Sequence, residues 1–136
     1  MNIPLVIAGG IALVTALIHG IVGDVALVRK IKVEALPSTP FGGPAGSKAL
    51  IRASWHLLTL VFAILAIALF VSGIRDTSDF APGVAYLAGA MYTAFAVTTM
   101  GVAIARSGAR GLVTHPAPLI FAAGSAVIWW GAIGVS

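Results

Sequence analysis

Four apolar runs, each about as long as a helix that crosses a bilayer, constrain the fold of this chain more than any other feature. They cover residues 4–28, 50–74, 82–105 and 116–135. A transmembrane helix needs about 20 mainly apolar residues, and a backbone in lipid must satisfy its hydrogen bonds internally. Only 9% of the residues are charged, against about 25% in soluble domains. We therefore predict an all-α integral membrane four-helix bundle, with residues 1–136 as a single transmembrane domain.

The connections between the runs predict an antiparallel order of helices. The second and third connections are short, which makes successive helices antiparallel neighbours. The first connection, residues 30–48, is the longest, and its prolines and glycines are expected to break any helix there. These residues are Pro37, Pro40, Gly42, Gly43, Pro44 and Gly46. We interpret the segment as a loose surface loop, with a loop that binds a partner or covers a site as the alternative.

The distribution of basic residues predicts the orientation in the membrane. Most of them lie in or beside the first and third connections: Arg29, Lys30, Lys32, Lys48, Arg52, Arg106 and Arg110. The second connection carries only Arg75, accompanied by Asp76 and Asp79. Cytoplasmic loops hold the excess of Lys and Arg, so we expect both termini outside (N-out and C-out). Because the basic residues flank apolar runs, the net charge of +4 indicates a bilayer and no nucleic-acid partner.

Asp24 places a carboxylate within the first apolar run. An ionisable group at the centre of a span costs roughly 3 kcal/mol, so it needs a partner or a purpose. Asp24 precedes Arg29 by five residues, which places it roughly 7 Å inside the cytoplasmic boundary. His56 follows Arg52 by four residues and lies at about the same depth. We predict a cytoplasmic-side polar cluster of Asp24, Arg52 and His56, which His115 could join from the start of the fourth helix.

His19 lies deeper than this cluster, roughly 15 Å from the boundary, and has no charged partner that the sequence identifies. A threonine hydroxyl or a backbone carbonyl on another helix would satisfy its ring. Gly20 lies on the same helix face as Asp24, and Gly23 on that of His19. At each glycine another helix or a cofactor could approach closely.

Four interpretations of these polar residues remain open. The first is structural, with every group paired inside the bundle and no cofactor. The second is haem b held by His19 and His56, although their depths differ by about 9 Å. The third is a divalent metal site formed by Asp24, His56 and His115, for which no local ligand motif is present. The fourth is a path for protons or a small ligand along Asp24 and the histidines.

Catalysis has little support in the sequence. No nucleophile elbow, phosphate loop or pair of carboxylates is present, and the absence of cysteine excludes thiol chemistry. The leading interpretation is therefore a non-enzymatic accessory or interaction subunit in contact with the lipid bilayer. Small residues spaced by four, such as Ala16 and Gly20, favour close packing of helices. They serve the bundle itself or, as the alternative, a homo-oligomer or a larger membrane complex.

Three short motifs give the chain a resemblance. His19 lies in the first run, the pair Trp55-His56 opens the second, and His115-Pro116 opens the fourth. This layout resembles small, uncharacterised four-helix membrane proteins of bacteria. The pair Gly23-Asp24 departs from the segment rich in glycine and arginine that is associated with that position. The resemblance implies a helical bundle in a bacterial inner membrane and implies no activity.

Overall fold

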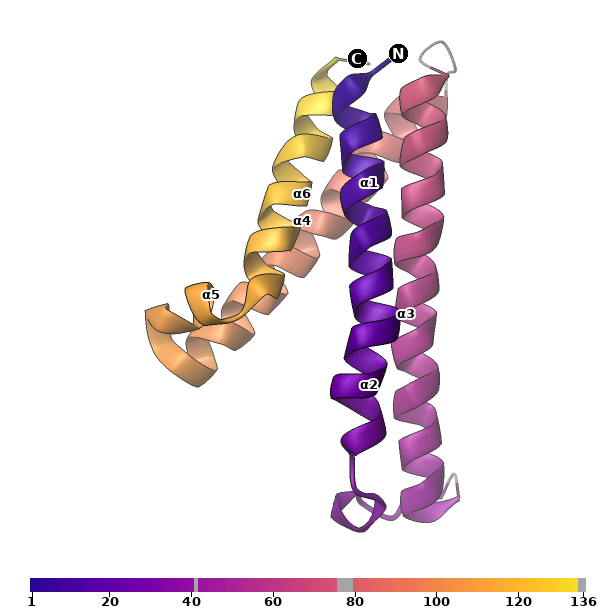
Figure 1. Ribbon diagram of the computed structural model, residues 1–136, viewed down its shortest axis with the longest axis vertical. Coiled ribbons are helices and arrows are strands. Elements are labelled where there is room, and N and C mark those ends of the chain that lie inside the picture. The colour runs from indigo at the N-terminus through magenta and orange to yellow at the C-terminus, as the bar shows by residue number, and fades with distance from the viewer. Residues whose placement is uncertain (41, 76–79, 135–136) are drawn as a thin grey trace. The chain divides into compact units, whose positions relative to one another are not determined.

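The computed structural model describes residues 1–40, 42–75 and 80–134, which form helices and turns without a strand. Four helical segments are long and apolar enough to cross a membrane (Figure 1). They are Ile3–Lys30, Gly43–Ile74, Phe80–Thr114 and Pro116–Ile133. The prediction of an all-helical chain with four such segments is confirmed for this part of the chain. The predicted end of the fourth run at Val135, and the turn with Asp76 and Asp79, lie outside the described residues.

The first segment is interrupted, whereas the sequence predicts one continuous helix over 4–28. The helix α1 covers Ile3–Leu17 and continues as a π-helical turn, η1, over Ile18–Gly23. A short α2, Asp24–Ala26, and a 3-10 turn η2, Val28–Lys30, follow. The π-helix is rare and is found mainly as single widened turns, often at functional sites. This turn contains His19 and ends directly before Asp24, so the irregular backbone coincides with the polar residues.

The first connection is shorter than the sequence predicts. After the 3-10 turn η3, Val33–Ala35, the helix α3 covers Gly43–Ile74, so the predicted helix-breaking effect of residues 43–48 is wrong. Pro44 lies in the first turn of α3, where its missing N–H would have no helical partner anyway. The Ser47 hydroxyl donates to the Pro37 carbonyl at 3.0 Å, and Lys48 Nζ donates to the Ile31 carbonyl at 2.7 Å. These bonds hold the connection against the start of α3.

The second half of the chain contains two long helices and a compact turn. The helix α4 covers Phe80–Ser107, two residues beyond the predicted end of the third run. A 3-10 turn η4, Gly108–Arg110, and a short α5, Gly111–Thr114, lead to α6, Pro116–Ile133. Pro116 begins α6, as the sequence predicts.

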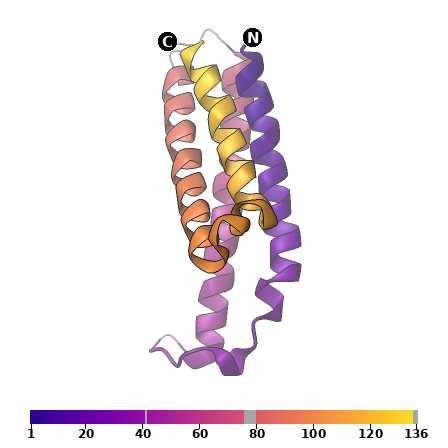
Figure 2. The same ribbon diagram turned by 90° about the vertical axis from the view of Figure 1, so that its left-hand side faces the viewer.

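The chain divides into two compact units. The hairpin unit is Leu13–Ile64, and the terminal unit is Met1–Ala12 with Leu65–Ser136. The helices α1 and α3 contribute to both units. In the hairpin unit, the end of the first helical segment runs beside the first half of α3 in both views (Figures 1 and 2). The prediction of a single domain stays a prediction.

The terminal unit is held by close helix contacts and a few polar bonds. The helices α4 and α6 lie side by side (Figure 2), and a Cβ atom on Gly89 would meet the Trp129 ring at 2.9 Å. Trp129 Nε1 donates to the Thr93 hydroxyl at 3.0 Å, which in turn lies 2.8 Å from the Ser125 hydroxyl. Small residues and interhelical hydroxyl bonds are the means by which helices associate in lipid.

Large apolar side chains cover the outside of the helices in both units. Leu57 is 63% exposed, Leu87 is 61% exposed and Trp130 is 66% exposed. Soluble monomers rarely expose large contiguous apolar patches, and exposed apolar side chains occur on all four long helical segments here. This distribution is compatible with helices that contact lipid.

Candidate functional site

The Asp24 carboxylate lies at the centre of a cluster of basic side chains in the hairpin unit. Asp24 begins α2 and is only 3% exposed. Its Oδ2 atom accepts a hydrogen bond from Arg29 Nε at 2.7 Å. Its Oδ1 atom lies 3.4 Å from Arg52 Nε and 3.6 Å from His56 Nε2. The structure therefore brings together Asp24, Arg52 and His56, and adds Arg29.

The local backbone explains why the sequence analysis did not include Arg29 in this cluster. On a continuous α-helix, residues five apart point about 140° away from each other. The chain leaves helical geometry at Leu27, whose φ is −121°, before the 3-10 turn η2 begins. This break allows Arg29 to reach Asp24. Arg52 and His56 need no such break, because residues four apart on α3 share one helix face.

The two oxygens of Asp24 are held differently. The bond from Arg29 to Oδ2 is a short, charge-assisted hydrogen bond. Oδ1 is buried and receives no hydrogen bond from any residue that the structure describes. Its neighbours Arg52 and His56 lie beyond the usual 2.7–3.2 Å range for such bonds, so Oδ1 has only these longer contacts. Asp24 thus has one firmly bound oxygen and one loosely bound oxygen.

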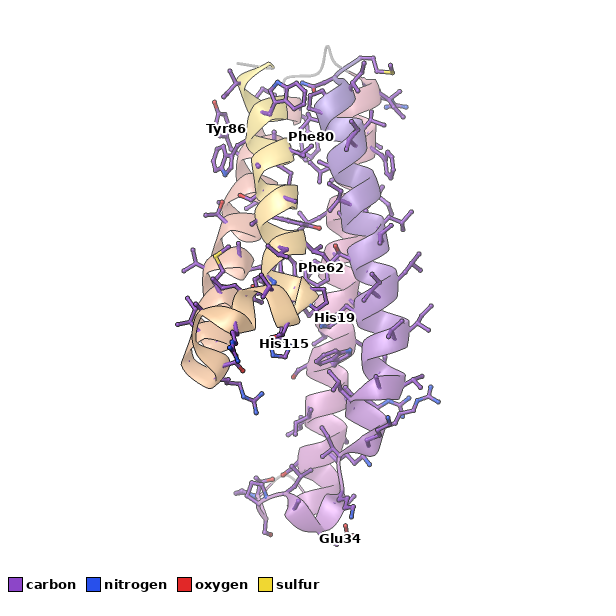
Figure 3. The ribbon with its side chains drawn as sticks, turned by 60° about the vertical axis from the view of Figure 1, so that its left-hand side comes forward. His19, Glu34, Phe62, Phe80, Tyr86 and His115 are labelled. Carbon is purple, nitrogen blue, oxygen red and sulfur yellow. The ribbon has the colours of Figure 1, made fainter. Side chains whose placement is uncertain are left out.

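His19 lies in η1 and contacts α3 through its ring and its backbone. Its Nδ1 atom lies 2.9 Å from the Thr59 hydroxyl. The imidazole stacks on the Trp55 ring with 4.1 Å between centroids and 9° between planes. Trp55 Nε1 donates to the backbone carbonyl of His19 at 2.8 Å. Phe62 completes the site with an edge contact at 5.5 Å (Figure 3). The sequence predicts a threonine hydroxyl or a backbone carbonyl as the partner of this ring, and Thr59 is a partner of the first kind.

The hydrogen bonds of Thr59 assign the proton on the His19 ring. The Thr59 hydroxyl donates its hydrogen to the Trp55 carbonyl at 3.2 Å, one helical turn back. A hydroxyl has one hydrogen, so toward His19 the Thr59 oxygen acts as the acceptor. In that arrangement Nδ1 of His19 is the donor, and in the neutral ring Nε2 keeps a lone pair.

The His19 ring lines a shallow groove of about 460 Å³ on the hairpin unit. The other lining residues are mainly apolar side chains of α3: Leu50, Ile51, Ser54, Trp55 and Leu58. An aromatic nitrogen with a lone pair beside an apolar groove can accept a hydrogen bond from the N–H or O–H group of a mainly apolar ligand, or coordinate a metal ion.

The two glycines beside the polar residues allow the close approach of α3. A Cβ atom on Gly20 would meet Thr59 Cγ2 at 2.6 Å, and one on Gly23 would meet Trp55 Cζ2 at 2.5 Å. Real Cβ atoms do not approach other atoms so closely. Of the two possibilities that the sequence analysis leaves open at these glycines, another helix takes the space.

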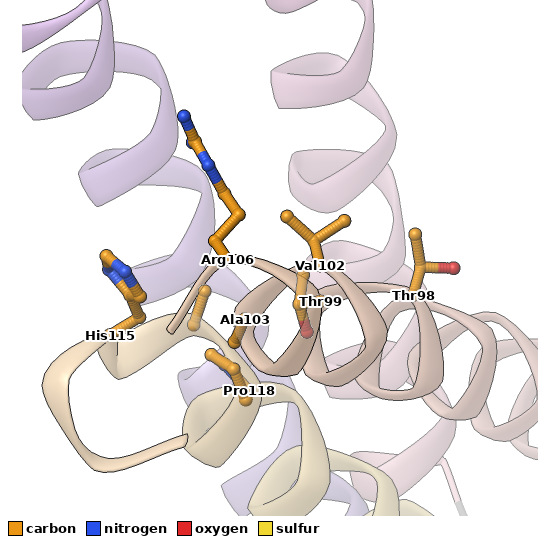
Figure 4. A pocket seen from close by; sticks show the side chains of 8 residues that line it. Thr98, Thr99, Val102, Ala103, Arg106, His115 and Pro118 are labelled. Carbon is orange, nitrogen blue, oxygen red and sulfur yellow. The ribbon is translucent and has the colours of Figure 1, made fainter. Parts of the chain in front are cut away.

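The remaining predicted site residues have different surroundings. His56, the second proposed haem ligand, faces Asp24, whereas His19 faces Thr59 and Trp55. His115 belongs to the terminal unit, where it precedes α6 and lines a cavity (Figure 4). Among residues 1–40, 42–75 and 80–134, no three His, Cys, Asp or Glu side chains form a group that could hold a metal ion.

Comparisons with protein-family models, with curated proteins and with solved structures found no match to this chain.

Proposed function

We propose that this chain is a non-enzymatic integral membrane protein that acts as an accessory or interaction subunit. The observation that carries this proposal is the cluster around Asp24. A buried carboxylate in a span is costly unless it is paired, and among the described residues the partners of Asp24 all come from the hairpin unit itself. Arg29 binds Oδ2, while Arg52 and His56 lie beside Oδ1. These groups hold the end of the first helical segment against α3, so the Asp24 carboxylate has a structural role.

The same proposal includes an antiparallel bundle with both termini outside, in a bacterial inner membrane. Contacts near the helix ends support the antiparallel order. Asn2, before α1, binds the Gly73 carbonyl near the end of α3 and the Gly131 carbonyl near the end of α6. At the opposite end of the first helical segment, the Ile31 carbonyl accepts a hydrogen bond from the Lys48 side chain near the start of α3. The excess of basic residues beside the first and third connections supports the orientation.

Cysteine labelling tests the orientation, because the native chain has no cysteine. Lys32→Cys and Gly134→Cys each introduce one thiol at an exposed, described position. In intact cells, a reagent that does not cross the membrane should label the Gly134→Cys protein and leave the Lys32→Cys protein unlabelled. The reverse labelling pattern would show that both termini face the cytoplasm.

The accessory role is tested on protein extracted from its own membrane in a mild detergent. We expect a particle larger than one 13.8 kDa chain in its detergent micelle, with no Soret band and no stoichiometric metal. A monomeric particle would contradict a role as an interaction subunit. A Soret band that disappears in His56→Ala would show that haem is bound there, and electron transfer would then be the proposed function instead of the accessory role.

A second candidate function is the binding of a cofactor or an apolar ligand at His19, and the assigned tautomer favours it. Histidines that bind metals usually donate their other ring N–H to a fixed partner, and the Thr59 hydroxyl, 2.9 Å from Nδ1 of His19, can be such a partner. The groove beside Trp55 is lined mainly by apolar side chains, as the sites of apolar ligands are. Haem would show as a Soret band that is lost in His19→Ala and shifted in Thr59→Val. A spectrum without that band would exclude haem.

A proton or small-ligand path through Asp24 is the remaining alternative. Purified protein in liposomes should not increase proton flux if Asp24 has only a structural role. A flux that Asp24→Asn abolishes while the protein stays folded would favour transport instead.

A further inference from the structure

The terminal unit contains a cavity of about 260 Å³ between the end of α4 and the start of α6. Apolar groups form most of its wall, including Val102 and Ala103 from α4 and Pro118 from α6. Figure 4 shows Arg106 and His115 toward one end of the cavity and Thr98 at the other. The cavity therefore combines an apolar lining with cationic and N–H groups at one end.

The turn between the two helices builds this cavity from tightly packed backbone. Gly108 has φ +58°, which favours glycine and lets the chain reverse after α4. Gly111 then packs against the Ala103 carbonyl so closely that a Cβ atom would overlap it. Pro118 is buried in the first turn of α6. Apart from Arg106 and His115, the lining side chains are short and have few rotamers, which favours a preorganised site.

The charges at this site have no counter-ion within this part of the sequence. From residue 80 to the end of the chain there is no Asp or Glu, whereas Arg106, Arg110 and His115 are all present. Among the described residues, no salt bridge involves Arg106 or His115. An external anion would therefore complement this end of the cavity.

The position of Arg106 identifies the kind of anion. It directly follows the third apolar run, so it lies where the span meets the aqueous boundary. The N-terminus of α6, a helix of 18 residues, adds the positive end of a helix dipole. An anionic head at the boundary, next to an apolar cavity within the span, matches the two parts of a phospholipid. Basic pockets at such boundaries bind lipid head groups.

We propose that this cavity binds an anionic phospholipid from the leaflet that faces the third connection. Its phosphate pairs with the Arg106 guanidinium and accepts a hydrogen bond from a ring N–H of His115. Part of an acyl chain occupies the apolar cavity along Val102 and Ala103. The proposal does not depend on the accessory role, because it uses only residues of the terminal unit.

The test measures lipid binding to purified protein in dodecyl maltoside by native mass spectrometry. The probes are dioleoylphosphatidylglycerol and the zwitterionic dioleoylphosphatidylcholine. We expect phosphatidylglycerol to bind more tightly, and Arg106→Gln to weaken its binding about fivefold, since one basic group near anionic lipid contributes about 1 kcal/mol. Arg75→Gln removes the same charge at the end of α3 and should leave the affinity unchanged. Equal losses in both variants, or equal affinity for the two lipids, would overturn the proposal.

Two further experiments complete the test. The first distinguishes a lipid site from a site for free phosphate, and the second uses a variant that should stay folded to test whether the lipid occupies the cavity. Glycerol 3-phosphate, the head group without acyl chains, should not displace the lipid even at millimolar concentration. Displacement at the concentration at which the lipid itself binds would reassign the site to a soluble anion. Val102 is 55% exposed, so Val102→Trp should fill the cavity and leave the fold intact. Unchanged lipid binding in that variant would show that the cavity is not the site.

Discussion

The Trp55 indole lies flat on the His19 imidazole and also donates its Nε1–H to the backbone carbonyl of the same histidine. This double contact lies at the π-helical turn η1, where the regular α-helical hydrogen-bond pattern is interrupted. A single side chain of α3 therefore fixes both the ring and the backbone of His19.

Trp55→Phe should separate these two contributions. Phenylalanine keeps an aromatic ring against His19 but removes the Nε1–H donor. We expect a loss of about 1 kcal/mol in the free energy of unfolding, the usual value for one hydrogen bond. Unfolding in mixed micelles with increasing sodium dodecyl sulfate measures it. Trp130→Phe is the matched control, since Trp130 is 66% exposed and should change stability by less than about 0.5 kcal/mol. Equal stability of both variants would mean that the bond to the carbonyl contributes nothing.

The ionic cluster predicts an asymmetry between its members. Arg29→Gln leaves the buried Asp24 carboxylate without its short bond and should destabilise the hairpin unit by about 2–3 kcal/mol, the cost of an unsatisfied charged group. Asp24→Asn should cost less, because the side chains of Arg29 and Arg52 are 61% and 52% exposed and can be solvated. Asp24→Ala should cost more than Asp24→Asn, since the amide still accepts hydrogen bonds.

The decisive measurement is the double variant Asp24→Asn with Arg29→Gln, unfolded under the same conditions. It should be more stable than Arg29→Gln alone, because the orphaned charge is gone. Glu34→Gln serves as the control for removing an exposed carboxylate and should be neutral. Additive losses in the double variant would show that Asp24 and Arg29 are not coupled.

The sequence was sufficient to predict the four helical segments and the nearness of Asp24 to Arg52 and His56. Both predictions depend on regular geometry: the length of an apolar run, and the rise and periodicity of an α-helix. The parts that could not be predicted depend on irregular backbone. The π-helical turn at His19 and the break at Leu27 have no signature in hydropathy, and the break is what brings Arg29 to Asp24. The tautomer of His19 likewise depends on where the Thr59 hydroxyl donates.

Glycine substitutions distinguish close helix contact from open surface. Gly23→Ala should destabilise the hairpin unit by about 1–3 kcal/mol, the usual cost of overpacking, because its new methyl group would overlap the Trp55 ring. Gly101→Ala should be neutral or stabilising by up to about 1 kcal/mol, since alanine is the better helix former and no atom lies within 4 Å of the added group. Thermal unfolding of the two variants makes the comparison. A Gly23→Ala protein as stable as Gly101→Ala would contradict the close approach of α3.

The protonation of His19 can be observed directly. In protein labelled with ¹⁵N at histidine and held above pH 8, where imidazoles are neutral, His19 should give the chemical-shift pattern of an Nδ1–H ring. In this form the Thr59 oxygen accepts the Nδ1–H bond, so Thr59→Val should shift the population toward Nε2–H, which is the more common form in free histidine. Thr93→Val removes a hydroxyl from the terminal unit and should leave the His19 signals unchanged. An Nε2–H pattern in the unaltered protein would mean that the Thr59 hydroxyl donates to His19, and the lone pair that makes His19 a candidate ligand would then belong to Nδ1.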